Sequence, residues 1–172
     1  MIFEEELINK AQSVIDSALK KQLKITTAES CTGGLISALI TEIPGASEVL
    51  ERGFVTYSNT AKQQMLGVSL ATLNKYGAVS IQTAEQMSRG AVNNSQADIG
   101  IAVTGIAGPG GGSKGKPVGL VYISGYNKLD DNLIVKEFNF KGNRQQIRLK
   151  TAENAFTLLL ELIAGTDYFV LG

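Results

Sequence analysis

Apolar and polar positions follow two different periods along the chain, and these periods predict helices and strands. Residues 3–22 repeat apolar side chains every three or four positions, the spacing of a helix with one buried face. Residues 98–105 form a nearly continuous apolar run, as expected for a strand covered on both faces. The same periods predict further helices at 35–43, 59–67, 80–96 and 144–163, and further strands at 24–28, 53–58, 118–126 and 132–140.

The order of these elements predicts the fold class. Strands alternate with helices along most of the chain, which is typical of α/β proteins with a parallel sheet. The last two strands are separated only by a turn around residues 127–131, so we expect them to form an antiparallel pair. We therefore expect a single three-layer α/β/α domain over residues 1–172, with a mixed, mostly parallel sheet.

Short polar residues and glycines mark the ends of the predicted helices. Asn59 or Thr60 is expected to cap the helix that ends at Gly67, and Ser80 to cap the helix that follows. The final helix should turn one apolar stripe toward the core. That stripe consists of Ala152, Ala155, Phe156, Leu159, Leu162 and Ile163.

Composition and charge narrow the class of protein. The chain is 44% apolar, and its 16 Lys and Arg residues balance 16 Asp and Glu residues. No global field therefore attracts nucleic acid or an anionic membrane. No apolar run approaches the roughly 20 residues of a membrane span. A single cysteine, Cys31, and an acidic start without a signal peptide lead us to expect a cytoplasmic protein.

The absence of histidine restricts the chemistry. Ser-His-Asp triads, Cys-His dyads and histidine-based zinc sites are all excluded, because the chain has no histidine. If the protein catalyses acyl transfer, its general base must be a lysine, a carboxylate or a tyrosine.

The stretch TTAESCTGGL, residues 26–35, joins a predicted strand to a predicted helix. Ser30 would lie at the carboxyl end of the strand, where unpaired N–H groups of Gly33 and Gly34 could stabilise an oxyanion. Cys31 is a rival nucleophile without an evident activator. The alternative interpretation is an ordinary turn in which Thr32 caps the helix.

Two other predicted strands also end near hydroxyl groups. Tyr57 and Lys62 flank the junction between the second strand and its helix, and Thr104 lies at the end of the third strand. Because the carboxyl ends of parallel strands share one edge of a sheet, this pattern favours a site along that edge. The alternative interpretation is that each residue has an ordinary structural role: a single lysine on a helix is more often solvated, and a single tyrosine is more often half-buried against its neighbours.

The glycine-rich segment at residues 106–117 resembles a phosphate-binding loop only superficially. Residues 110–116 match G-x-x-x-x-G-K, but Pro117 replaces the Ser or Thr that should follow, and a strand comes next instead of a helix. We therefore reject ATP hydrolysis. Backbone amides of the loop could still cradle a phosphate or a ribose, whereas the alternative is a flexible surface loop. The glycines concerned are Gly105, Gly108, Gly110 and Gly111.

Five stretches closely resemble the CinA carboxy-terminal domain family, whose best-known activity is nicotinamide mononucleotide deamidation. They are TTAESCTGGL, ITEIPGASEVLERGFVTYSNTAKQQMLGV, YGAVS, VTGIAGPGGGSKGKPVGLVY and FKGNRQQIR. The resemblance covers nearly the whole chain. It implies hydrolysis of the nicotinamide carboxamide to give nicotinic acid mononucleotide and ammonia, with no cofactor and no metal. A chain of 172 residues is expected to be the stand-alone form of the domain.

The resemblance also assigns roles to individual residues. Ser30 matches the family's nucleophile and Lys62 its base, while Tyr57 and Thr104 match its supporting hydroxyls. Arg144 matches a basic position near the substrate, for which we infer phosphate binding. The chain departs from many members at residues 114–116, Lys-Gly-Lys, where acids are common; we expect these residues in the exposed part of the loop.

Two other functions remain as alternatives. The chain could be a non-catalytic module that binds pyridine nucleotides or docks on a partner, in which case it would bind nucleotide without releasing ammonia. A role in handling DNA is disfavoured by the zero net charge and the lack of an aromatic and basic patch. The sequence is also compatible with a homo-oligomer.

Overall fold

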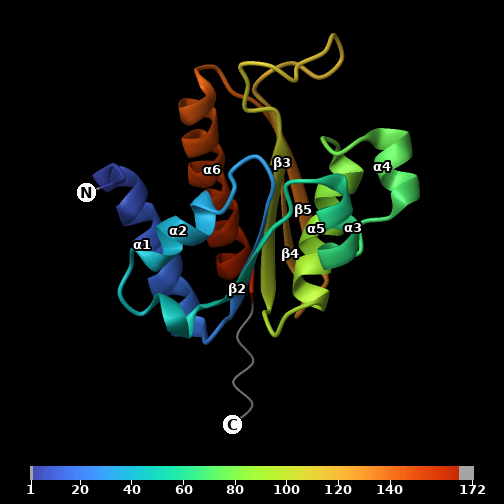
Figure 1. Ribbon diagram of the computed structural model, residues 1–172. Coiled ribbons are helices and arrows are strands. Elements are labelled where there is room, and N and C mark those ends of the chain that lie inside the picture. Colours follow the sequence, from blue (N-terminus) through green and yellow to red (C-terminus); the bar gives the residue numbers. More distant parts are fainter. Residues whose placement is uncertain (1, 167–172) are drawn as a thin grey trace.

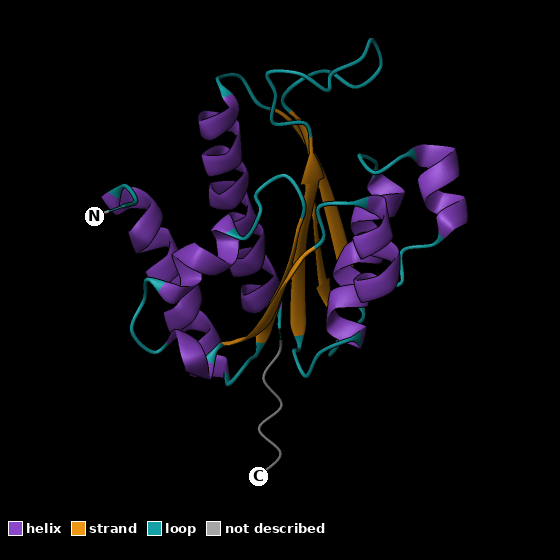
Figure 2. Cartoon of the chain, in the orientation of Figure 1, coloured by secondary structure: helices purple, strands orange, loops and turns teal. Residues whose placement is uncertain are grey.

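The computed structural model describes residues 2–166, which surround a five-stranded sheet with helices (Figures 1 and 2). The strands are β1 (Ile25–Glu29), β2 (Leu50–Val55), β3 (Ile99–Gly105), β4 (Leu120–Asn127) and β5 (Asn132–Asn139). The helices are α1 (Glu5–Lys21), α2 (Leu35–Thr41), α3 (Asn59–Leu66), α4 (Leu70–Tyr76), α5 (Ile81–Asn93) and α6 (Arg144–Gly165), with a short 3-10 turn at Ala46–Glu48. Positions 1 and 167–172 of the predicted domain lie outside the described residues.

The sheet has the order β2-β1-β3-β4-β5 and is mixed. β1 pairs in parallel with both β2 and β3, whereas β4 pairs antiparallel with β3 and with β5. Only β4 therefore runs against the other described strands, which confirms the predicted mostly parallel sheet. The strand β1, which lies inside the sheet between β2 and β3, is buried along its whole length, as a strand covered on both faces should be.

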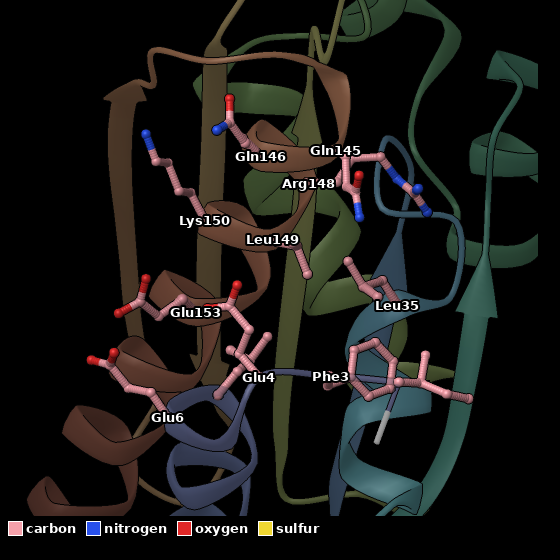
Figure 3. Close-up of a pocket in the computed structure, with 12 residues that line it drawn as sticks. Phe3, Glu4, Glu6, Leu35, Gln145, Gln146, Arg148, Leu149, Lys150 and Glu153 are labelled. Atoms are coloured by element: carbon pink, nitrogen blue, oxygen red, sulfur yellow. The ribbon is translucent and has the colours of Figure 1, made fainter.

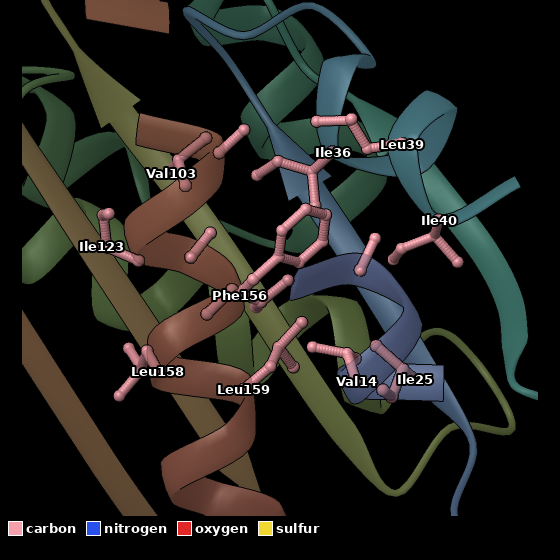
Figure 4. Close-up of a cluster of buried hydrophobic side chains, with 14 of the residues drawn as sticks. Val14, Ile25, Ile36, Leu39, Ile40, Val103, Ile123, Phe156, Leu158 and Leu159 are labelled. Atoms are coloured by element: carbon pink, nitrogen blue, oxygen red, sulfur yellow. The ribbon is translucent and has the colours of Figure 1, made fainter. Parts of the chain in front are cut away.

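Helices cover the sheet on both sides and make a three-layer α/β/α arrangement. Figure 1 shows α1, α2 and α6 on one face and α3, α4 and α5 on the other. The larger core lies on the α6 side, where the Phe156 ring reaches from α6 toward Ile36 of α2 (Figure 4). All six residues of the predicted α6 stripe are buried, so that prediction is confirmed.

Some predicted boundaries are wrong. β2 begins at Leu50, three residues before the predicted strand, and ends at Val55, so Tyr57 lies beyond it. β2 is an edge strand on which only Phe54 is fully buried, which explains its weak apolar pattern. Helix α4 was not predicted, because its seven residues bury only Thr72 and Leu73.

Three helix ends can be compared with the predicted caps. The cap of α3 is Ser58, whose hydroxyl accepts the Ala61 N–H at 3.0 Å, and not Asn59 or Thr60. Gly67 ends α3 with a positive φ of 70°, as predicted. The cap of α5 is Ser80, also as predicted. Ser58 has the extended backbone of a cap residue, so the helix starts one residue earlier than the sequence pattern suggested.

A glycine in α5 lets α3 approach closely. A Cβ at Gly90 would lie 1.9 Å from the carbonyl oxygen of Leu66, at the end of α3. No side chain can be accommodated at that distance, so the two helices meet backbone to backbone. This contact holds α3, and with it Lys62, against the rest of the domain.

Candidate active site

The parallel pairing of three strands brings the predicted site residues to one edge of the sheet. Glu29, the last residue of β1, lies opposite Val55 of β2 and Val103 of β3. Ser30 directly follows β1, and Thr104 lies at the end of β3. The carboxyl ends of these strands therefore place side chains from separate parts of the sequence next to one another.

The turn after β1 is fixed by the carboxylate of Glu29. The two Glu29 oxygens accept the N–H groups of Gly34, Ile36 and Ser37 at 2.9–3.1 Å, at the start of α2. The buried carboxylate thus caps α2, where a negative charge also complements the helix dipole. The predicted Thr32 cap is wrong, because the buried Thr32 hydroxyl has no hydrogen-bond partner among residues 2–166.

The backbone donors of this turn also differ from the prediction. The Gly33 N–H donates to the carbonyl oxygen of Ser30 at 3.0 Å, and the Gly34 N–H donates to Glu29. Neither group is free to bind an oxyanion. The N–H groups of Cys31 and Thr32, by contrast, donate to no other residue within positions 2–166. The free donors of the turn therefore belong to the two residues that directly follow Ser30.

Lys62 and Ser30 form the central contact of the site. Lys62 Nζ lies 2.9 Å from Ser30 Oγ and 2.8 Å from the carbonyl oxygen of Thr56. The Lys62 side chain is 1% exposed, although lysine is almost never fully buried. The fold thus brings these two residues together, although they lie 32 positions apart in sequence.

Burial changes the protonation of this lysine. Loss of water around the ammonium group lowers the pKa of Lys62 from 10.5 to about 8. About a tenth of the molecules then carry a neutral amine at pH 7, since each pH unit below the pKa lowers that fraction about tenfold. A neutral amine has a lone pair that can accept the proton of Ser30.

Cys31 has the opposite character. Burial raises the pKa of its thiol to about 11. The thiol therefore stays protonated at neutral pH, and a protonated thiol is a poor nucleophile. Cys31 also lines the pocket, but its protonated thiol is a weaker candidate for a nucleophile than the Ser30 hydroxyl, which contacts Lys62.

Thr104 holds one wall of the site in place. Its hydroxyl donates to the carbonyl oxygen of Ala78 at 2.7 Å, and its side chain is fully buried. Ala78 and Val79 belong to the connection between α4 and α5, which sequence analysis did not assign to the site. The oxygen of the Thr104 hydroxyl can still accept a further hydrogen bond from a ligand.

Tyr57 and Arg144 lie together at the rim. The Tyr57 side chain is 60% exposed, and its hydroxyl accepts a hydrogen bond from Arg144 Nη2 at 2.9 Å. Arg144 Nη1 donates to the carbonyl oxygen of Gly108 at 2.8 Å. Arg144 thus connects the loop after β2 with the glycine-rich loop. Three of its five N–H groups have no partner in the part of the chain that the structure describes.

One pocket of about 270 Å³ collects these groups. Nine of the twelve predicted site residues line it, and Thr32, Gly33 and Gly34 do not. The nine are Ser30, Tyr57, Lys62, Thr104, Gly105, Gly108, Gly110, Gly111 and Arg144. Sequence reasoning missed the capping role of Glu29 and the part played by Arg148, which contacts the turn after β1.

The glycine-rich loop is only partly as expected. Lys114 and Gly115 are exposed, as predicted. Lys116 is partly buried instead, because its ammonium group donates to the carbonyl oxygen of Tyr76 at the end of α4. The loop is followed by the strand β4, which agrees with the rejection of a phosphate-binding loop.

Within residues 2–166, every helix is too short or too polar to cross a bilayer. The same residues bring together no three His, Cys, Asp or Glu side chains that could hold a metal ion.

The chain is similar to known proteins over most of its length. Residues 8–163 match the model of the CinA C-terminal domain. A competence-damage inducible protein of Caldicellulosiruptor bescii is 53% identical over 150 residues, and one of Acetivibrio thermocellus is 51% identical over 149 residues. Each alignment covers 87% of this chain but only 36% and 35% of the relatives. The chain therefore spans about a third of the length of these curated relatives.

Solved structures show the same arrangement. The competence/damage inducible protein CihA from Agrobacterium tumefaciens superposes with a TM-score of 0.91 at 47% identity, over 93% of this chain and 97% of that one. A CinA superfamily protein from Klebsiella pneumoniae gives a TM-score of 0.89 at 30% identity, over 93% and 99% of the two chains.

Replacing Lys62 by methionine should make the protein more stable at neutral pH. Folding lowers the lysine pKa from 10.5 to about 8, so the burial cost is full below pH 8 and is lost as the pH rises through 10.5. At about 1.4 kcal/mol for each pKa unit, the shift corresponds to roughly 3 kcal/mol. We expect Lys62→Met to gain up to that amount in free energy of unfolding at pH 7, measured with urea, and to converge with the wild type near pH 10.5.

The exposed Lys114 offers a matched control, because Lys114→Met removes the same charge without a change in burial. Its stability should equal that of the wild type at every pH. If Lys62→Met shows no increase in the free energy of unfolding at pH 7, or the same increase at pH 10.5, then burial of the charged Lys62 amine does not destabilise the fold as inferred.

Proposed function

The chain belongs to the CinA C-terminal domain family, and on that premise we propose that it is a nicotinamide-nucleotide amidohydrolase. In this proposal it converts nicotinamide mononucleotide and water to nicotinic acid mononucleotide and ammonia. The substrate class comes from the resemblance described above. The relatives named here are called competence-damage inducible proteins, so the amidohydrolase activity of this chain is our inference.

One observation carries the proposal: a buried lysine whose amine lies 2.9 Å from a serine hydroxyl in a pocket. Structural lysines gain little from such an arrangement, because burying an ammonium group without a carboxylate partner is unfavourable. A nucleophile and its base need this contact, since the base must reach the proton that it removes. The low pKa of Lys62, about 8, suits a base that works near neutral pH.

The first half of the reaction is acylation of Ser30. Neutral Lys62 takes the hydroxyl proton while Ser30 Oγ forms a bond to the carboxamide carbon. Negative charge develops on the carboxamide oxygen, and the Cys31 N–H, free and next to the nucleophile, is our candidate to bind it. When the intermediate collapses, the C–N bond breaks, and the Lys62 ammonium gives its proton to the departing nitrogen, which leaves as ammonia.

The second half is hydrolysis of the acyl-enzyme. Lys62, neutral again, takes a proton from a water molecule that attacks the same carbon. The bond to Ser30 Oγ then breaks, the proton returns to Ser30, and nicotinic acid mononucleotide leaves. Tyr57 and Thr104 would bind the substrate from the rim and from the wall of the pocket.

The phosphate end of the substrate would lie near Arg144 and the glycine-rich loop. A guanidinium group forms strong paired hydrogen bonds with phosphate oxygens. Arg144 stands at the rim, with three N–H groups not used by Tyr57 and Gly108. The loop adds backbone amides around Gly110 and Gly111, which need no specific side chain to contact phosphate or ribose.

The proposed function is tested by ammonia release from nicotinamide mononucleotide, with Ser30→Ala and Cys31→Ala as the paired variants. Loss of the nucleophile should lower kcat by about a thousandfold or more, whereas Cys31→Ala should stay within about threefold of the wild type. Nucleotide binding without ammonia release by the wild type would favour the non-catalytic module. An inactive Cys31→Ala beside an active Ser30→Ala would reverse the assignment of the nucleophile.

The pH dependence of kcat/KM tests Lys62 as the base. Activity should rise with pH through an apparent pKa of about 8, because only the deprotonated amine accepts a proton. Lys62→Arg keeps the charge but cannot deprotonate, so it should be nearly inactive across the whole range. Substantial turnover by Lys62→Arg, or a profile that falls from pH 6 to pH 9, would contradict this role.

A comparison of two substrates tests the role of Arg144. Arg144→Ala should raise KM for nicotinamide mononucleotide about tenfold or more, since a charged hydrogen bond is worth about 1.5–3 kcal/mol. It should leave nicotinamide riboside, which lacks the phosphate, almost unchanged. Arg89→Ala, which removes an exposed arginine paired with Asp131 outside the pocket, is the control. Equal losses on both substrates would remove Arg144 from phosphate binding.

A further inference from the structure

Arg148 connects helix α6 to the turn that carries Ser30. It lies one helical turn after Arg144, and Figure 3 shows its side chain extending from α6 toward the loop after β1. Its Nε donates to the carbonyl oxygen of Cys31 at 3.2 Å, and its Nη2 donates to that of Thr32 at 2.8 Å. One guanidinium group thus holds two successive carbonyl groups of the turn, 116 positions or more away in sequence.

Holding these carbonyls also orients the neighbouring N–H groups. In a planar trans peptide, the C=O of one residue and the N–H of the next point in opposite directions. Because Arg148 binds the Cys31 carbonyl, the Thr32 N–H points away from Arg148. The Ser30 carbonyl accepts the Gly33 N–H inside the turn, so the Cys31 N–H points out of the turn.

The two N–H groups left over belong to buried residues. Cys31 is 6% exposed and Thr32 is fully buried, yet neither N–H donates to another residue within positions 2–166. An N–H in the protein interior without an acceptor is rare in folded proteins, because its lost hydrogen bond to water is not replaced. Groups of this kind beside a nucleophile are what an oxyanion site requires.

We propose that Arg148 is a positioning residue for the amide hydrolysis. By holding the Thr32 carbonyl oxygen it fixes the peptide whose Gly33 N–H donates to the Ser30 carbonyl, and it thereby keeps the Cys31 N–H turned toward the oxyanion. This inference rests on the proposed function, because it takes Ser30 as the nucleophile. Arg148 does not line the pocket that contains Ser30 and Lys62, so it acts through the turn and does not touch the substrate.

The far side of Arg148 is open, which makes the proposal testable. Arg148 lines a hollow of about 410 Å³ between the start of α1 and the first turns of α6, with Phe3, Leu35, Leu149 and Lys150 among its other walls (Figure 3). Removal of the Arg148 side chain would extend this hollow to the carbonyl groups of the turn. A free guanidinium ion could then enter and donate to the same two oxygens.

The experiment is chemical rescue of Arg148→Ala. We expect kcat to fall about 10- to 100-fold and KM to change less than about threefold, because binding is lost in the transition state and not in the ground state. The midpoint of the pH profile should stay in place, because the substitution does not touch Lys62. Millimolar guanidinium chloride should restore kcat at least about fivefold, whereas the same concentration of tetramethylammonium chloride, which cannot donate hydrogen bonds, should not. Lys150→Ala, exposed on the same helix, should behave as the wild type in both salts.

Several results would overturn the proposal. These are an unchanged kcat in Arg148→Ala, a shifted pH midpoint, or a loss of kcat in the folded variant that guanidinium does not restore. If Arg148→Ala does not fold, Arg148→Lys gives the answer: lysine can reach one carbonyl group, so kcat should fall with an unchanged pH midpoint, and a normal kcat would refute the role.

A second readout separates this inference from the proposed function. The rate at which a fluorophosphonate reagent labels Ser30 also depends on stabilising negative charge on the oxygen that faces the turn. If the wild type is labelled but does not hydrolyse nicotinamide mononucleotide, the proposed substrate is wrong. In that case, slower labelling of Arg148→Ala that guanidinium restores to the wild-type rate still supports the role of Arg148 as a positioning residue. If the wild type is not labelled at all, Ser30 is no nucleophile and the inference fails with it.

Discussion

An amine enclosed by protein, 2.9 Å from a hydroxyl and with no carboxylate among residues 2–166 to pair with its charge, is the interaction around which the rest of the domain is arranged. It is unfavourable for folding, because Lys62 would keep its proton far more easily in water. The close backbone contact of Gly90 with Leu66 holds α3 so near the sheet that Lys62 stays buried. The fold thus accepts a local loss of stability at the point where the proposed reaction requires a neutral amine, as functional sites commonly do.

The other half of this contact depends on the backbone around Ser30. Three independent elements restrain that turn: the parallel pairing of β1 with β3, the Glu29 carboxylate at the start of α2, and the Arg148 guanidinium from α6. Each restrains a different backbone group. Among residues 2–166, the N–H groups of this turn that stay without an acceptor are those of Cys31 and Thr32, directly after Ser30. A histidine is not needed in such a site, because burial adjusts the base and the backbone supplies the donors.

Much of the fold and part of the candidate site could be predicted from the sequence. Apolar periodicity identified the buried strands, and hydroxyl residues at their carboxyl ends predicted that Ser30 and Thr104 would lie near each other, because parallel strands share an edge. The helix cap could not be predicted from local preferences, which favoured Thr32, because Glu29 reaches α2 only after the chain has folded back. The free N–H groups were misassigned to Gly33 and Gly34 for a similar reason: their acceptors depend on the shape of the turn. The spacing of Arg144 and Arg148, four residues on one helix, was a signal that could have placed both near the site.

The two walls of the pocket differ in how far they can adapt. The wall formed by the turn after β1 is tied to the core on three sides, whereas the opposite wall is a glycine-rich loop that is largely exposed around residues 109–115 and tethered by Lys116 and by Arg144. A larger or differently shaped ligand would therefore be accommodated by the loop, without disturbing the spacing of Ser30 and Lys62. This arrangement separates the reactive contact from ligand recognition: substitutions in the loop can change the shape and charge of the pocket while the Ser30–Lys62 contact stays fixed by the core.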